Sequence, residues 1–231
     1  MSLAQDIQAL RERVLADLNV AHDYYEDTKT AWRIVRDVVA TGKKITTTNA
    51  VTGTVTTEAE LVAKSIGYVK QQLAEATFQQ FLSIFEIFFF DLLRLWLTAY
   101  PQNLGGKKVE FKAVLEAADK DAIVLLVVNK ELNEVLYERP AGWFAYFEER
   151  AKLGCPTADE ICRVAEAKAT RDVLTHNRGV ATKSYEAKAK PLARYADGEL
   201  IEVGEAYHRA TWVLLCKVVA DVTDAAGAKA A

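Results

Sequence analysis

The sequence predicts an all-α protein, a helical bundle with long N-terminal helices and one or two small β-hairpin inserts. Two observations indicate this class. Apolar residues recur every three or four positions over long stretches, and three short motifs have the form of helix N-terminal caps. Of 231 residues, 51% are hydrophobic and 26% are charged, which supplies enough apolar surface for one large core.

The first predicted helix covers residues 3–39. Ser2 is its expected N-cap and Gly42 its expected stop. The stripe is long enough for a bundle helix or one arm of a coiled hairpin. Its apolar positions in the first half are Ile7, Leu10, Val14 and Leu18.

A Thr-rich segment, residues 44–57, follows and is either a short β-hairpin or a loop. Thr57 and Glu60 then form a capping box, which predicts a second long helix to about Ala99. Pro101 prevents that helix from continuing. We expect residues 1–56 and 57–231 to form one continuous structural unit.

The middle of the chain predicts three shorter helices, at 110–118, 121–137 and 142–153. The β-branched run at 123–128 is also compatible with a strand. A helix is favoured because Lys130, Glu131 and Glu134 continue a helical pattern without turn residues.

A second Thr-x-x-Glu capping box, at Thr157 and Glu160, predicts a helix over residues 158–177 that stops at Gly179. After it, residues 194–204 have the turn signal of a small hairpin around Asp197-Gly198. The last predicted helix covers about 205–224, and the alanine-rich tail beyond it is expected to fray.

Composition limits the function classes. The net charge of −3 argues against a protein that coats nucleic acid, although a nuclease depends on local charge. We expect a cytoplasmic protein without a membrane segment. The most apolar stretch, Phe81–Leu97, contains Glu86, Asp91 and Arg94, whose charges favour a buried helix over a bilayer span.

The cysteines predict no cofactor. Cys155, Cys162 and Cys216 form no Cys-x-x-Cys pair, so half-buried reduced thiols are expected. The alternative is zinc held by Cys155, Cys162 and a histidine, but this spacing fits no common zinc module. We therefore expect neither a metal nor another cofactor.

The most informative motif is Arg171-Asp172-Val173-Leu174-Thr175-His176, followed by Asn177-Arg178-Gly179. Histidine exchanges a proton near neutral pH, and arginine keeps its charge and binds phosphate oxygens through a planar fork. Together they suffice for phosphodiester chemistry without a metal. The alternative to a catalytic role is that these cations lie at a helix C-terminus and interact only with its terminal carbonyls.

Helical geometry sets the relations within this motif. Asp172 and His176 are four residues apart and share a face, so the carboxylate is expected to orient the imidazole. Arg171 and His176 are five residues apart, about 140° around an ideal helix. The frayed helix end, the length of arginine or a second chain must bring both groups to one phosphate.

The motif resembles that of the HEPN superfamily (higher eukaryotes and prokaryotes nucleotide-binding). The resemblance rests on Arg171, the polar Asp172, His176 and the stop at Gly179, at the end of a late helix in an all-α bundle. The layout over about residues 60–224 is also similar to that of the larger RiboL-PSP-HEPN proteins.

The resemblance implies a metal-independent endoribonuclease that works as a homodimer, with two motifs facing one cleft. It implies that His176 is the general base or acid, that Arg171 stabilises transition-state charge, and that Asp172 positions the pair. The products would carry a 2′,3′-cyclic phosphate. Many such proteins act in toxin–antitoxin or defence systems, so an antitoxin protein is a possible partner.

Local charge favours RNA as the partner. Residues 171–194 contain six basic and two acidic side chains, a net charge of +4. We expect Asn177, Arg178 and Lys183 to contact substrate, with Asn177 able to hold backbone instead. The alternative is that these cations stay solvated beyond a helix end.

The sequence also leads to predictions for three further side chains. Glu86 lies in an apolar run and needs a partner, either Arg94 or, if it contacts the motif helix, Arg171. His22 and His208 have no acid–base neighbours in the sequence and are expected to be structural.

Two other functions remain open from the sequence. One is a non-catalytic HEPN-like module for assembly or for RNA or protein binding. The other is a coiled-hairpin scaffold built on residues 3–99 that binds no ligand.

Overall fold

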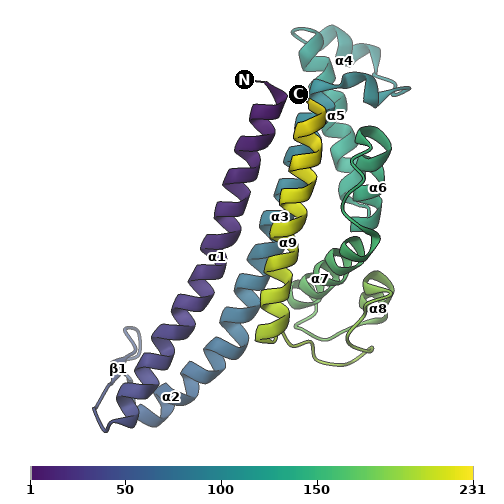
Figure 1. Cartoon of the computed structure of the whole chain (residues 1–231). Coiled ribbons are helices and arrows are strands. Elements are labelled where there is room, and N and C mark those ends of the chain that lie inside the picture. The colour runs from purple at the N-terminus through teal and green to yellow at the C-terminus, as the bar shows by residue number, and fades with distance from the viewer. Residues whose placement is uncertain (1, 231) are drawn as a thin grey trace.

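The computed structural model describes residues 2–230 and is 75% helical, which confirms the all-α class. The helix α1 (Leu3–Ala40) runs beside α3 (Ala74–Ala99) and α9 (Glu205–Ala230), and these three form the central layer (Figure 1). The shorter helices α5 (Lys120–Leu136), α6 (Pro140–Ala151) and α7 (Ala158–His176) cover the other side of α3.

The remaining elements lie at the two ends of the bundle and beside α7. A two-stranded antiparallel hairpin, β1 with β2, resolves the alternatives for the Thr-rich segment, pairing Thr47 with Thr56. Helix α8 packs on α7, and the sequence did not predict it. The bounds are β1 (Thr47–Thr48), β2 (Val55–Thr56), α2 (Glu58–Gly67), a 3₁₀ turn (Pro101–Leu104), α4 (Phe111–Glu116) and α8 (Lys183–Ala189).

The core is built around α3. Five of its phenylalanines are at most 1% exposed and pack in one core with residues of α1, α5, α6 and α9. Burying each such side chain contributes on the order of 2 kcal/mol, so this one helix organises the bundle. The buried phenylalanines of α3 are Phe78, Phe81, Phe85, Phe88 and Phe89.

Capping side chains fix where the main helices begin. The Ser2 hydroxyl accepts a hydrogen bond from the backbone N–H of Gln5, and Thr57 and Thr157 do the same for the N–H groups of Glu60 and Glu160. Each glutamine or glutamate side chain also accepts a hydrogen bond from the N-cap backbone. All three predicted caps are therefore confirmed.

The second long helix is interrupted by one irregularity. A π-helical segment, Tyr68–Leu73, joins α2 to α3 where the sequence predicted one regular helix. Up to the start of this segment the buried positions are four residues apart, at Leu61, Ser65 and Val69, and the next is Ala74, five further on. A π-turn accommodates one extra residue, so the segment resets the apolar stripe to face the core again.

Two predictions near the C-terminus are wrong. Residues 194–204 form no hairpin of their own. Their backbone pairs with residues 179–181 instead, through the N–H of Ala181 to the carbonyl of Glu199 and the N–H of Ile201 to that of Gly179. The alanine-rich tail does not fray before Ala230, because the apolar face of α9 continues to a fully buried Ala226.

Two histidines sit in the core between α1, α3 and α9, as their structural assignment predicted. His22 stacks on Trp212 with 3.9 Å between ring centroids. His208 is fully buried, and its Nε2 lies 2.8 Å from the Thr77 hydroxyl. Because that hydroxyl donates to the carbonyl of Leu73, Nε2 of His208 carries the proton and donates.

No helix among residues 2–230 combines the length and apolar character that a bilayer crossing requires.

Burial of His208 gives the fold a pH dependence. Desolvation, with a smaller contribution from nearby His22, lowers the pKa of His208 from 6.5 to about 4. The unfolded chain therefore binds a proton that the folded chain does not between these pH values, so stability falls as pH falls. We expect up to about 3 kcal/mol of unfolding free energy to be lost through this residue between pH 7.5 and pH 4.

Urea unfolding followed by circular dichroism at several pH values measures this effect. His208→Gln keeps a donor near Thr77 but cannot titrate, so its unfolding free energy should change less with pH than that of the wild type. Parallel pH profiles for the two proteins would show that His208 is not responsible.

Candidate functional site

The motif occupies the last two turns of α7, as predicted. The helix ends because Gly179 adopts φ +79°, and its N–H returns to the carbonyl of Val173 at 3.2 Å. Arg178 also has a positive φ, +52°, which turns the chain sharply after Asn177. This turn leads into α8, which packs back against α7.

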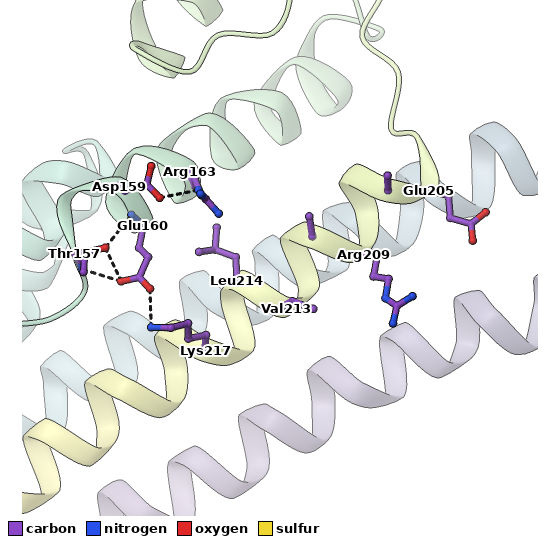
Figure 2. Close-up of a pocket in the computed structure, with 11 residues that line it drawn as sticks. Thr157, Asp159, Glu160, Arg163, Glu205, Arg209, Val213, Leu214 and Lys217 are labelled. Carbon is purple, nitrogen blue, oxygen red and sulfur yellow. Dashed lines mark hydrogen bonds and ion pairs between the residues drawn. The ribbon is translucent and has the colours of Figure 1, made fainter.

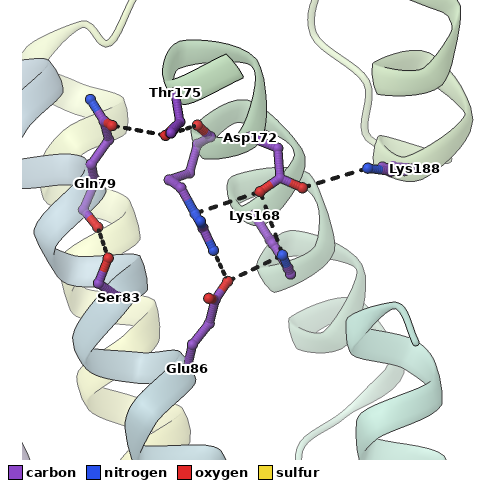
Figure 3. A network of polar contacts seen from close by, with 8 residues as sticks. Gln79, Ser83, Glu86, Lys168, Asp172, Thr175 and Lys188 are labelled. Atoms are coloured by element: carbon purple, nitrogen blue, oxygen red, sulfur yellow. Dashed lines mark hydrogen bonds and ion pairs between the residues drawn. The ribbon is translucent and has the colours of Figure 1, made fainter. Parts of the chain in front are cut away.

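Arg171 lies on the face of α7 that packs against α3. Its side chain is 16% exposed, and its Nη2 donates to Glu86 Oε1 on α3 (Figure 3). The Nε–H is buried without a hydrogen-bond partner, and the nearest carboxylate oxygen, from Asp172, is 3.6 Å away. A guanidinium has five N–H donors, so the contact with Glu86 engages only part of its hydrogen-bonding capacity.

Two lysines complete a cluster of alternating charge around this pair (Figure 3). Lys168 Nζ lies 3.2 Å from Glu86 Oε1 and 3.5 Å from Asp172 Oδ1. Lys188, on α8, lies 3.6 Å from Asp172 Oδ2. Three cations and two carboxylates thus join α3, α7 and α8, and the cluster keeps one net positive charge.

Of the two partners proposed for Glu86, the structure shows Arg171 and not Arg94. Arg94 donates to Asn129 on α5 at 2.6 Å, whereas Glu86 contacts Arg171 and Lys168. A carboxylate in an otherwise apolar helix is therefore compensated by the motif helix. Thr175, whose hydroxyl is 2.9 Å from Gln79 Oε1, adds a second polar contact between α7 and α3 (Figure 3).

His176 is the last residue of α7 and is exposed. Among the described residues it has no hydrogen bond to Arg171 or Asp172, so the expectation that Asp172 orients the imidazole is wrong for this chain. Asp172 instead lies among Arg171, Lys168 and Lys188. Three cations lie within 3.6 Å of the carboxylate, and their combined attraction exceeds that of a solvated imidazole at the helix end.

The three expected substrate contacts have different environments. Asn177 holds backbone, because its side-chain amide donates to the carbonyl of Val180. Arg178 and Lys183 are exposed, and neither forms an ion pair within residues 2–230. Their charges are therefore available to a polyanion.

A buried carboxylate that the sequence did not single out supports the segment after the motif. Glu166 is 4% exposed and accepts hydrogen bonds from the hydroxyls of Thr170, Tyr185 and Tyr207 and from Nε of Arg194. Burial and the adjacent Glu166 charge raise the pKa of Tyr207, so its phenol remains a donor. This network fixes α8 and the residues after it against α7 and α9.

A pocket lies at the other end of α7, between its first turns and α9 (Figure 2). It has a volume of about 900 Å³ and an apolar floor that includes Val213 and Leu214. The charges on its walls mostly pair with each other, as Lys217 does with Glu160 at 2.7 Å. That contact, together with the Thr157 backbone, lowers the pKa of Glu160 to about 2.

Within the described chain, no three histidine, cysteine or acidic side chains are grouped as metal ligands would be. Cys155, Cys162 and Cys216 are unpaired and half-buried, and burial raises the pKa of the Cys216 thiol to about 11.

Comparison with protein-family models, with curated proteins and with solved structures finds no match for this chain. The HEPN resemblance therefore rests on the motif and on its place in the helical layout.

The contact between Glu86 and Arg171 should stabilise the fold. Glu86→Gln leaves the partly buried guanidinium with a weaker partner, and we expect the free energy of unfolding to fall by about 1–3 kcal/mol. Urea unfolding at pH 7.5 measures this value.

Asp91→Asn is the matched control, since Asp91 lies five residues later on α3 and pairs with Arg13 at 2.8 Å. That pair is largely exposed, so its loss should cost less than about 1 kcal/mol. Equal effects of the two substitutions would mean that the Glu86 contact is no stronger than a surface ion pair.

Proposed function

We propose that this chain is a metal-independent endoribonuclease of HEPN type, acting as a homodimer. The observation that carries the proposal is the end of α7. There an exposed imidazole, His176, lies five residues after Arg171, whose guanidinium is held by Glu86 on α3. A proton-transfer group and a fixed guanidinium are the groups that metal-free cleavage of RNA needs.

The chemistry assigns a role to each residue. His176 takes the proton from a ribose 2′-hydroxyl, whose oxygen attacks the adjacent phosphorus. The P–O5′ bond breaks as the 2′,3′-cyclic phosphate forms, and the leaving oxygen takes up a proton. Arg171 stabilises the negative charge on the phosphoryl oxygens of the transition state. DNA lacks the attacking hydroxyl and should not be cleaved.

Arg171 and His176 do not contact each other within one chain, and this supports a dimeric site. The two side chains leave α7 about 140° apart on an ideal helix, and Arg171 faces α3. A second motif related by two-fold symmetry would supply the missing group. A restraining partner, such as an antitoxin protein in a toxin or defence system, is compatible with a nuclease of this kind.

A second candidate is a non-catalytic HEPN-like module that binds RNA or protein. The burial of Arg171 and its ion pair with Glu86 favour this function, because the charge of Arg171 is compensated inside one subunit. The motif would then serve mainly to join α7 to α3.

Cleavage of labelled RNA in the presence of EDTA distinguishes the two functions. The wild type should release fragments that end in a 2′,3′-cyclic phosphate. His176→Ala should lower kcat by about 10²- to 10⁴-fold, the usual contribution of a general acid or base. The exposed position of His176 means that this substitution should leave the melting temperature unchanged.

His22→Ala does not serve as a control, because His22 packs on Trp212 in the core. Ser184→Ala is the better one, since Ser184 is exposed on α8. Equal cleavage by the wild type and His176→Ala, or no cleavage of any RNA by a folded dimer, would favour the non-catalytic module.

A further inference from the structure

A surface outside the motif is formed where the α5–α6 junction meets α8. Arg139, the N-cap residue of α6, donates from Nη1 to the carbonyl of Ala187 on α8 at 3.2 Å. The next residue, Lys188, reaches Asp172 beside Arg171. Two short contacts therefore connect residue 139 to the motif, although more than thirty positions separate them in the sequence.

The junction also exposes an aromatic ring. Tyr137, two residues before Arg139, is 89% exposed, the most exposed aromatic side chain of the described chain. An isolated surface tyrosine is ordinary, but aromatic rings next to basic groups are the elements from which single-stranded nucleic-acid sites are built. Bases stack on the ring while cations follow the phosphates.

The two neighbouring carboxylates have contacts of their own. Glu138 folds against the first turn of α6, where Gly142 leaves room for it and the helix dipole offsets its charge. Glu186 accepts a hydrogen bond from the backbone N–H of Asp197 at 2.8 Å. Lys188 is 43% exposed, so it can leave Asp172 for a phosphate at small cost.

We propose that Tyr137, Arg139 and Lys188 form a binding surface for single-stranded RNA that flanks the cleavage point. Tyr137 stacks on a base, and Arg139 and Lys188 contact successive phosphates that lead to Arg171. This inference rests on the proposed function for its choice of RNA. It adds a substrate-binding role for α8 and for a junction that lies outside the motif.

The surface makes a prediction about which nucleic acids bind. Stacking and phosphate contacts do not read the 2′-hydroxyl, so single-stranded DNA of the same sequence should bind within a few-fold of RNA. Duplex RNA, whose bases are already stacked, should bind much more weakly.

Fluorescence anisotropy tests the surface with the full-length His176→Ala protein, which binds without cleaving. The probe is a labelled single-stranded RNA of about 12 nucleotides, within the usual range of site sizes. Arg139→Ala and Lys188→Ala should each weaken binding and reduce the salt slope by about 0.7. Tyr137→Ala should weaken binding about tenfold at an unchanged slope, and Tyr137→Phe should not.

Matched controls lie on α1 and α4. Arg33→Ala, Tyr24→Ala and Lys112→Ala each remove an exposed side chain of the same kind far from α8 in the sequence. If the three test variants bind within twofold of these controls, or if the parent protein binds no single strand at low salt, the proposal is overturned.

The binding surface and the nuclease function can be contradicted independently of each other. If the three variants lose single-strand binding but the wild type never cleaves RNA, the binding surface is supported and the nuclease function is contradicted. If all three variants cleave RNA with an unchanged KM, the nuclease function is supported and the binding surface is contradicted.

Discussion

Burial of the α3 surface is the constraint on which the rest of this structure depends. Twelve of its 26 residues are buried, so it must be covered on more than one side. The long helices α1 and α9 cover one side, and α5, α6 and α7 cover the other (Figure 1). The surrounding helices together bury the apolar side chains of α3.

Glu86 is a partly buried carboxylate on this helix, and it connects the core to the candidate site. A carboxylate on a buried helix needs a cation, and the helix that supplies it is α7, which carries the motif. The cluster therefore fixes Arg171 relative to α3 and leaves His176 at the solvated end of α7. Fold stability and site geometry depend on the same contact.

Much of this fold follows from local rules that operate on neighbouring residues. Capping boxes and apolar stripes located the starts of α1, α2 and α7, because both signals lie within a few residues of the helix end they determine. Helix α8 was missed although Thr182 caps it, with its hydroxyl accepting from the N–H of Tyr185. Its seven residues are too short to show a period, and its stability comes from Glu166 and α7.

The errors about the site arose from contacts between distant parts of the chain. Helical spacing placed Asp172 beside His176, but Lys188, from a helix absent from the prediction, helps to hold Asp172 elsewhere. The turn at Asp197-Gly198 was real, yet its flanking residues pair with residues 179–181 rather than with each other. Spacing within one helix shows which side chains can contact each other. Charged residues from other helices determine which of these contacts form.

The central claim is that each chain contributes half of a catalytic site. Mixing two inactive variants, Arg171→Ala and His176→Ala, tests it most directly, because Lys168 still pairs with Glu86 when Arg171 is removed. If two chains share each site, equal amounts of the exchanged variants should recover about a quarter of the wild-type cleavage rate. A mixture that remains as inactive as its components, with exchange demonstrated, would contradict the account.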